Sequence, residues 1–208
     1  MSNSGKHVVA GHPIPPEPWA STPRFIEAVR VALVMHATQR RKGTTIPYAS
    51  HLLGTCSIAL DYGANEDQAI AAVLHDAIED VHYAPGAREA VAAFGDEVLR
   101  LVLACTDADE EPKPDWRPRK ETYIAHLAHA DAAVLLVSAA DKLHNARSIV
   151  ADLRRHGPSM FGRFNPDSDP IWYYRSLVTA FQANPAAPAD LIAELDRVVG
   201  EMERLAGG

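Results

Sequence analysis

The sequence predicts an all-α fold, a single bundle of about eight to ten helices. Apolar residues recur at spacings of three and four along most of the 208-residue chain, as they do on the buried face of a helix. Capping residues and helix-ending glycines bound these segments. No stretch alternates apolar and polar residues between turn signals, so no strand is expected.

The chain divides into a short arm and one folded domain. Residues 1–21 are rich in Pro, Gly and Ser and predict an extended arm. Residues 22–208 form the domain. Its first helix begins at Ser21-Thr22-Pro23, which supplies a capping hydroxyl and a proline near the first turn. The run RFIEAVRVALVMHATQRR keeps helical spacing after them.

The remaining helices follow a loop that is rich in Gly, Thr and Pro. Gly63 is suited to end one helix, and Asn65 to cap the next. The predicted helices cover about 50–62, 66–81, 86–93, 95–105, 117–129, 132–155, 171–182 and 187–205.

Composition narrows the classes of function. The formal charge of -7 argues against broad binding of nucleic-acid backbones but leaves a small anionic substrate open. Cys56 and Cys105 are the two cysteines and predict buried thiols in a reducing compartment. The apolar runs are interrupted by charged residues or histidine, and no apolar leader is evident. We therefore expect a cytoplasmic protein without a membrane partner, whose oligomeric state is open.

The segment AAVLHDAIEDV places acids and an imidazole in apolar surroundings. His75 and Glu79 are four residues apart, as are Asp76 and Asp80, so they form two neighbouring stripes of one predicted helix. Burial of these groups is costly unless a divalent cation compensates. The alternative interpretation is a charged helix face in water.

Two further residues favour a metal site. His51 lies at the start of the helix that follows the loop, and Asp141 follows the apolar run VLLVSAA. A carboxylate in such a buried position is rarely without a partner. Together with His75 and Asp76, these residues offer two nitrogen and two oxygen ligands, a set suited to Mn²⁺, Fe²⁺, Zn²⁺ or a similar metal.

The order His51 … His75-Asp76 … Asp141 resembles the signature of the HD phosphohydrolase superfamily. The flanking motifs resemble the hydrolase domain of Rel/Spo alarmone enzymes and the stand-alone small alarmone hydrolases. The resemblance covers about residues 24–180. The motifs that carry it are His36, Gln39, Arg41-Lys42, Pro47-Tyr48, AAVLHDAIEDV, Phe94-Gly95 and Asp141-Lys142-Leu143-His144-Asn145. The resemblance implies hydrolysis of the 3′-pyrophosphate of guanosine tetra- or pentaphosphate, with Mn²⁺ or another divalent metal as cofactor.

The resemblance also assigns roles to single residues. The implied metal ligands are His51, His75, Asp76 and Asp141, and the implied catalytic acids are Glu79 and Asp80. The candidates for substrate binding are Arg41, Lys42 and Asn145, to which the sequence context adds Tyr174. Which of the two acids donates and which accepts a proton is left open.

The sequence departs from the family pattern at three places. The segment from Arg41 to Tyr48 is one residue longer than the usual spacing, Leu52 replaces a proline, and Asp107 replaces a lysine common in bifunctional enzymes. Two alternatives therefore stay open. One is an HD phosphohydrolase that acts on another nucleotide, and the other is a non-catalytic nucleotide sensor.

Other polar residues have both a functional interpretation and a purely structural one. His36 is expected either at the edge of the core or beside the substrate. Arg117, Arg119 and Lys120 cluster near a helix start, where cations are unfavourable. They predict either a phosphate contact or a solvated surface.

Overall fold

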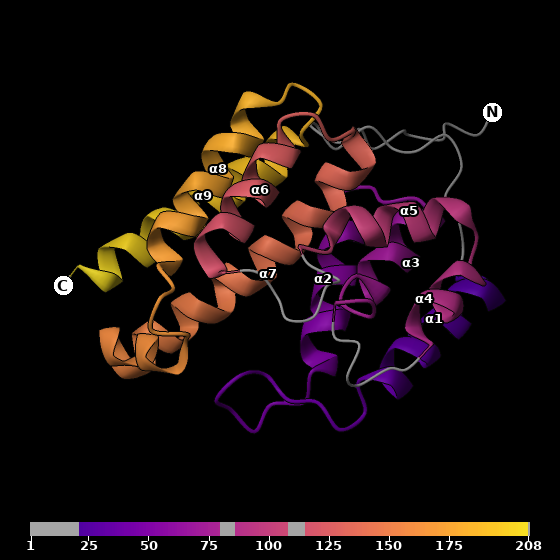
Figure 1. Ribbon diagram of the computed structural model, residues 1–208, viewed down its shortest axis with the longest axis horizontal. Helices are drawn as coiled ribbons and strands as arrows, with labels where there is room; N and C mark the ends of the chain where they lie inside the picture. Colours follow the sequence, from indigo (N-terminus) through magenta and orange to yellow (C-terminus); the bar gives the residue numbers. More distant parts are fainter. Residues whose placement is uncertain (1–20, 80–85, 108–114, 208) are drawn as a thin grey trace, which may run out of the picture.

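A computed structural model describes residues 21–79, 86–107 and 115–207 (Figure 1). Over these ranges the chain forms nine α-helices, one 3₁₀ helix and no strand, apart from an isolated bridge between Arg40 and Pro47. The helices are α1 Pro23–Met35, α2 Ala49–Asp61, α3 Glu66–Leu74, α4 Ala87–Ala92, α5 Asp96–Cys105, α6 Trp116–Leu127, α7 Ala132–His156, η1 Gly157–Arg163, α8 Pro170–Ala183 and α9 Ala189–Ala206. The prediction of an all-α fold is confirmed. The predicted arm, residues 1–21, lies outside the described residues except for its last residue.

Side-chain caps begin several helices where the sequence predicts them. The Thr22 hydroxyl accepts from the backbone N–H of Phe25 at the start of α1. Asn65 and Gln68 form a reciprocal capping box at the start of α3. These contacts satisfy amide groups that have no partner inside their helix.

Helix α7 is the centre of the molecule (Figure 1). It packs against α2, α3 and α5 on one side and against α8, α9 and η1 on the other. Helix α1 covers α3, and α6 packs on α8. Because the buried face of α7 includes Asp141, the central helix carries a charged side chain into the core. No helix among the described residues is long and apolar enough to cross a membrane.

Two helices end earlier than predicted. Helix α1 ends at Met35 and does not extend through Arg41, and α3 ends at Leu74 and does not extend to residue 81. Residues 75–79 continue as turns. The cause at α3 is local, because the His75 imidazole contacts the Ala72 carbonyl at 2.8 Å, the carbonyl that would accept the next helical hydrogen bond. His75 and Glu79 therefore do not share the face of one α-helix, and Asp80 lies outside the described residues.

Candidate metal centre and cleft

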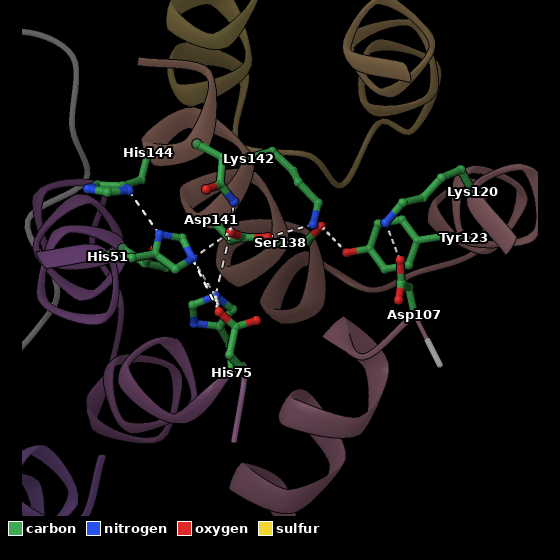
Figure 2. A network of polar contacts seen from close by, with 12 residues as sticks. His51, His75, Asp107, Lys120, Tyr123, Ser138, Asp141, Lys142 and His144 are labelled. Carbon is green, nitrogen blue, oxygen red and sulfur yellow. Dashed lines mark hydrogen bonds and ion pairs between the residues drawn. The ribbon is translucent and has the colours of Figure 1, made fainter. Parts of the chain in front are cut away.

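Four predicted ligands converge at one point of the core, and Figure 2 labels three of them, His51, His75 and Asp141. The Nε2 atoms of His51 and His75 lie 3.1 Å apart. An Asp76 carboxylate oxygen lies 3.3 Å from the His51 Nε2 and 3.1 Å from the His75 Nε2. The corresponding distances from an Asp141 oxygen are 3.2 and 3.5 Å. The residues predicted to bind one metal thus lie together, although they come from three separate segments.

Three elements place the four candidate ligands. His51 lies in the first turn of α2, His75 and Asp76 directly follow α3, and Asp141 lies near the middle of α7. These elements pack against one another, so the bundle core fixes their spacing. His51 is 1% and His75 2% exposed, which keeps both imidazoles away from bulk water.

Neighbouring side chains hold the two carboxylates. The Tyr48 hydroxyl donates to Asp76 at 2.6 Å. The Lys142 ammonium donates to one Asp141 oxygen at 2.5 Å, and the Asn145 amide donates to the other at 2.7 Å. Such contacts to ligand carboxylates orient them and reduce their freedom.

The electrostatics of the cluster favour a positive charge at its centre. Burial lowers the pKa of His75, but the Asp76 and Asp141 carboxylates outweigh burial and hold this pKa well above its ordinary value. Burial raises the pKa of Asp76, but His75 and His51 outweigh it and hold this pKa well below its ordinary value. For Asp141, Lys142 and the two imidazoles likewise outweigh burial and lower the pKa. The two carboxylates are therefore ionised and available as ligands.

The arrangement fits a divalent cation. Two donors that bind one metal at about 2.1 Å and at right angles lie about 3.0 Å apart. The nitrogen–oxygen distances of the cluster, from 3.1 to 3.5 Å, are close to this spacing. His51, His75 and Asp141 also form a group whose ligand atoms all lie within 4.8 Å of one another. A mixed nitrogen and oxygen set of this kind suits Mn²⁺, Fe²⁺ or Zn²⁺.

A cleft of about 810 Å³ lies next to this cluster. Its walls include Tyr48, Glu79 and Lys142 at the end near the ligands. Most charged side chains along it are cations, in a chain whose net charge is -7. The cationic residues are Arg40, Arg41, Lys42, Arg119, Lys120, Lys142, Arg155 and Arg163, and the acidic ones are Glu79 and Asp152. The cleft is therefore suited to an anionic ligand that reaches the metal cluster.

One face of α7 forms a wall of the cleft. Asn145, Ser148, Asp152 and Arg155 line it at spacings of three and four residues, and Asp141 lies one turn before Asn145. At 1.5 Å per residue, the wall from Lys142 to Arg155 is about 20 Å long. This length exceeds that of a single phosphate group and suits a nucleotide.

Several predicted substrate contacts are already engaged with one another. Arg41 donates to the Asn145 side-chain oxygen, so the Asn145 amide links Arg41 to Asp141. The Arg41 guanidinium also lies 5.6 Å from the centre of the Tyr48 ring. Lys42 lines the cleft and is exposed, and Tyr174 lines it from a buried position. All four predicted substrate-binding residues thus lie at the cleft.

The predicted cationic cluster divides in the structure. Arg119 and Lys120 both contact Asp107, whose side chain is 6% exposed. Burial raises the pKa of Asp107, but Lys120 and Arg119 outweigh it and lower this pKa to about 2. Arg117 instead pairs with Glu121 and stacks on Trp172. Arg119 and Lys120 thus share one carboxylate, which leaves one positive charge at the wall of the cleft.

The structure describes one of the two candidate catalytic acids. Glu79 lines the cleft and is partly buried, within electrostatic reach of Lys120. Asp80 lies outside the described residues.

His36 is 3% exposed, contacts Gln39 and stacks on Tyr48 at 5.3 Å, so it supports the wall of the cleft from behind.

Some residues of the site have no role in the sequence prediction. Lys142 and Tyr48 hold ligands, yet the sequence marks them only as parts of a motif. Arg163 reaches the cleft from η1, where its side chain packs against Gly43, and pairs with Asp152 at 2.7 Å. Adjacency to a ligand was an available signal for Lys142, but no local pattern indicates Arg163.

The comparisons with known proteins agree with this geometry. The family model described as HD domain matches residues 28–164. The chain belongs to the HD domain family. A GTP pyrophosphokinase of Streptomyces coelicolor is 34% identical over 131 residues, which are 62% of this chain and 15% of that protein. A probable guanosine-3′,5′-bis(diphosphate) 3′-pyrophosphohydrolase of Synechocystis is 31% identical over 120 residues, 56% of this chain and 15% of that protein. The chain thus spans a small part of these relatives.

Two solved structures are similar over most of their length. A metazoan ortholog of SpoT, described as hydrolysing ppGpp, superposes with a TM-score of 0.70 at 24% identity and covers 91% of this chain and 99% of that one. The protein lmo0812 of Listeria monocytogenes has a TM-score of 0.63 at 27% identity, covering 76% of this chain and 99% of that one. The resemblance predicted from the motifs is confirmed by these comparisons.

Proposed function

We propose that this chain is a metal-dependent phosphohydrolase that removes the 3′-pyrophosphate of guanosine tetra- or pentaphosphate and releases pyrophosphate. The observation that carries the proposal is the convergence of two histidines and two aspartates next to a cation-lined cleft. The names of the Synechocystis relative and of the metazoan structure support the choice of substrate.

His51, His75, Asp76 and Asp141 would hold the cation, and Mn²⁺ is the metal we propose. A divalent metal bound there lowers the pKa of water and stabilises charge that develops on phosphate oxygens. The buried imidazoles and the contacts from Tyr48 and Lys142 keep the ligands in place without substrate.

The protein groups of the reaction lie on the cleft side of the cluster. Glu79 follows the ligand pair by one turn and faces the cleft, so its carboxylate can accept the proton of the attacking water. We propose Asp80 as the second acid, on the family resemblance alone; one of the two acids would serve the attacking water and the other the leaving oxygen. The division of the two roles is open.

The nucleotide would lie along α7. Arg41 offers a planar guanidinium for a base or a phosphate, and Lys42 adds a second cation at the rim. Asn145 is already bonded to Arg41 and Asp141, so a substrate contact to its amide requires the exchange of one of these bonds. Tyr174 closes the wall behind them.

The test is to incubate the purified protein with guanosine tetraphosphate and Mn²⁺ and to follow GDP and pyrophosphate. An Asp76→Ala variant serves as the control. Formation of both products by the wild type but not by the control supports the proposal. Metal binding without turnover overturns the substrate assignment. Other nucleotides are then assayed, and release of orthophosphate from one of them identifies a different HD phosphohydrolase. Tight nucleotide binding without turnover of any nucleotide in saturating Mn²⁺ identifies a sensor.

A further inference from the structure

Behind His51, on the side away from the other ligands, lies an imidazole that the proposed function does not use (Figure 2). The Nδ1 of His144 is 2.9 Å from the Nδ1 of His51. The two rings are 4.9 Å apart and tilted by 47°. The next polar neighbour of the same His51 nitrogen is the Thr55 hydroxyl at 3.4 Å. His144 is therefore the closest hydrogen-bond partner on the back of this ligand.

The direction of this hydrogen bond follows from the chemistry of a metal ligand. His51 faces the cluster with its Nε2, and that atom must offer a lone pair to bind a cation. Its Nδ1 must then carry the hydrogen. A hydrogen on the His51 Nδ1 requires a lone pair on the His144 Nδ1, so His144 accepts and carries its own hydrogen on Nε2.

The other histidine ligand is held in a different way. The Nδ1 of His75 contacts the Ala72 carbonyl, an acceptor in every state of the protein. His51 has no backbone carbonyl in this position among its described contacts. The orientation of His51 thus depends on the side chain of another helix.

A glycine on α2 makes room for the His144 ring. A Cβ atom at Gly54 would lie 2.2 Å from the His144 Cδ2 and 2.3 Å from its Nε2, which is far inside van der Waals contact. Glycine inside a helix costs about 1 kcal/mol relative to alanine, and the close approach of the ring accounts for it here. The space that Gly54 leaves on α2 therefore allows His144 of α7 to lie against His51.

We propose that His144 is a positioning residue for the metal site. It accepts the Nδ1–H of His51 and thereby fixes His51 as an Nε2 ligand, and Gly54 provides the space that this contact needs. The inference rests on the metal site of the proposed function but not on its substrate. Loss of such a partner of a ligand histidine typically weakens metal binding about 10- to 100-fold.

The test compares two variants of similar size, His144→Asn and His144→Leu. The Asn side-chain oxygen can replace the Nδ1 acceptor, whereas Leu offers no acceptor. We expect His144→Leu to weaken Mn²⁺ binding about 10- to 100-fold in isothermal titration calorimetry, and His144→Asn to stay within about threefold of the wild type. Urea denaturation of the metal-free variants reports any loss of folding separately.

A second pair of variants tests the clearance. Gly54→Ala should weaken Mn²⁺ binding in the wild-type background because it displaces the His144 ring. The same substitution should add little in a His144→Ala background, where the ring is absent.

Equal affinity for Mn²⁺ in the Leu and Asn variants, whether both are unchanged or both are reduced, overturns the role of the acceptor. If the wild type binds no divalent metal, the proposed function itself is overturned. If the wild type does not hydrolyse the alarmone but the two His144 variants still differ in Mn²⁺ affinity, only the proposed substrate is overturned.

Discussion

The two ends of the cleft are built differently. At the inner end, each proposed ligand is buried or half-buried and has at least one polar partner, such as Tyr48 for Asp76. At the outer end, cations come from the loop after α1 and from the region of η1, and residues such as Lys42 and Arg155 are exposed. The difference indicates that the metal end is preorganised, whereas the outer end can adapt to its ligand. Substitutions should therefore affect the two ends to different degrees.

The largest effect is expected at the inner end. Asp141→Ala removes a ligand and leaves Lys142 without its carboxylate partner, so metal binding and hydrolysis should both be lost. Calorimetry with Mn²⁺ and an assay of pyrophosphate release check this. Asp152→Asn on the same face of α7 is the matched control, and it should keep the metal affinity. Retention of the metal by Asp141→Ala would remove Asp141 from the ligand set.

The next effect separates chemistry from metal binding. Glu79→Gln keeps the size of the side chain but removes its ability to accept a proton. We expect metal affinity to be kept and kcat to fall by about 10²- to 10⁴-fold. Steady-state kinetics at saturating Mn²⁺ measure the change, with the exposed Glu97→Gln on α5 as control. Rates like those of the wild type in Glu79→Gln would exclude it from the mechanism.

A smaller effect, on stability, is expected at the wall between the two ends. The pKa of Asp107 is lowered from 3.8 to about 2. At pH values above the ordinary pKa, its ion pairs therefore stabilise the fold by about 2 kcal/mol. This contribution is lost as the pH falls through the folded-state value. Urea denaturation should show Asp107→Asn less stable than the wild type at neutral pH, with a difference that shrinks toward pH 2. A difference that is independent of pH would contradict the ion-pair explanation.

The smallest effect is expected at the outer end. Arg41→Ala should raise KM for guanosine tetraphosphate about tenfold and change kcat little, because the lost contact binds substrate and transition state alike. Arg30→Ala on the exposed face of α1 is the control. An equal fall in kcat would show that Arg41 acts in the reaction step and that the outer end is less adaptable than proposed.

Much of the fold follows from the sequence because its signals are local. Caps such as Thr22 and Asn65 act within a few residues, and the spacing of apolar residues repeats along each helix. The ends of α1 and α3 were predicted too far along the chain. At α3 the cause is the contact between His75 and a backbone carbonyl, which spacing alone does not encode.

The site divides in the same way. The convergence of the four proposed ligands could be predicted because their residue types and their order form a motif in an apolar context. The contact between Arg41 and Asn145 joins residues that are far apart in the sequence, and only the packing of α7 brings them together. The position of Arg163 in the cleft depends likewise on the path of the chain after α7.

The contact at Gly54 ties the amino-acid choice at one position to that at a distant one. Any side chain at position 54 competes with the ring at position 144 for the same space, so the two substitutions should not act additively. In a library of random variants, replacements of Gly54 should survive selection for metal binding mainly when position 144 changes as well. A pair of positions that vary together would then mark this contact in sequence data alone.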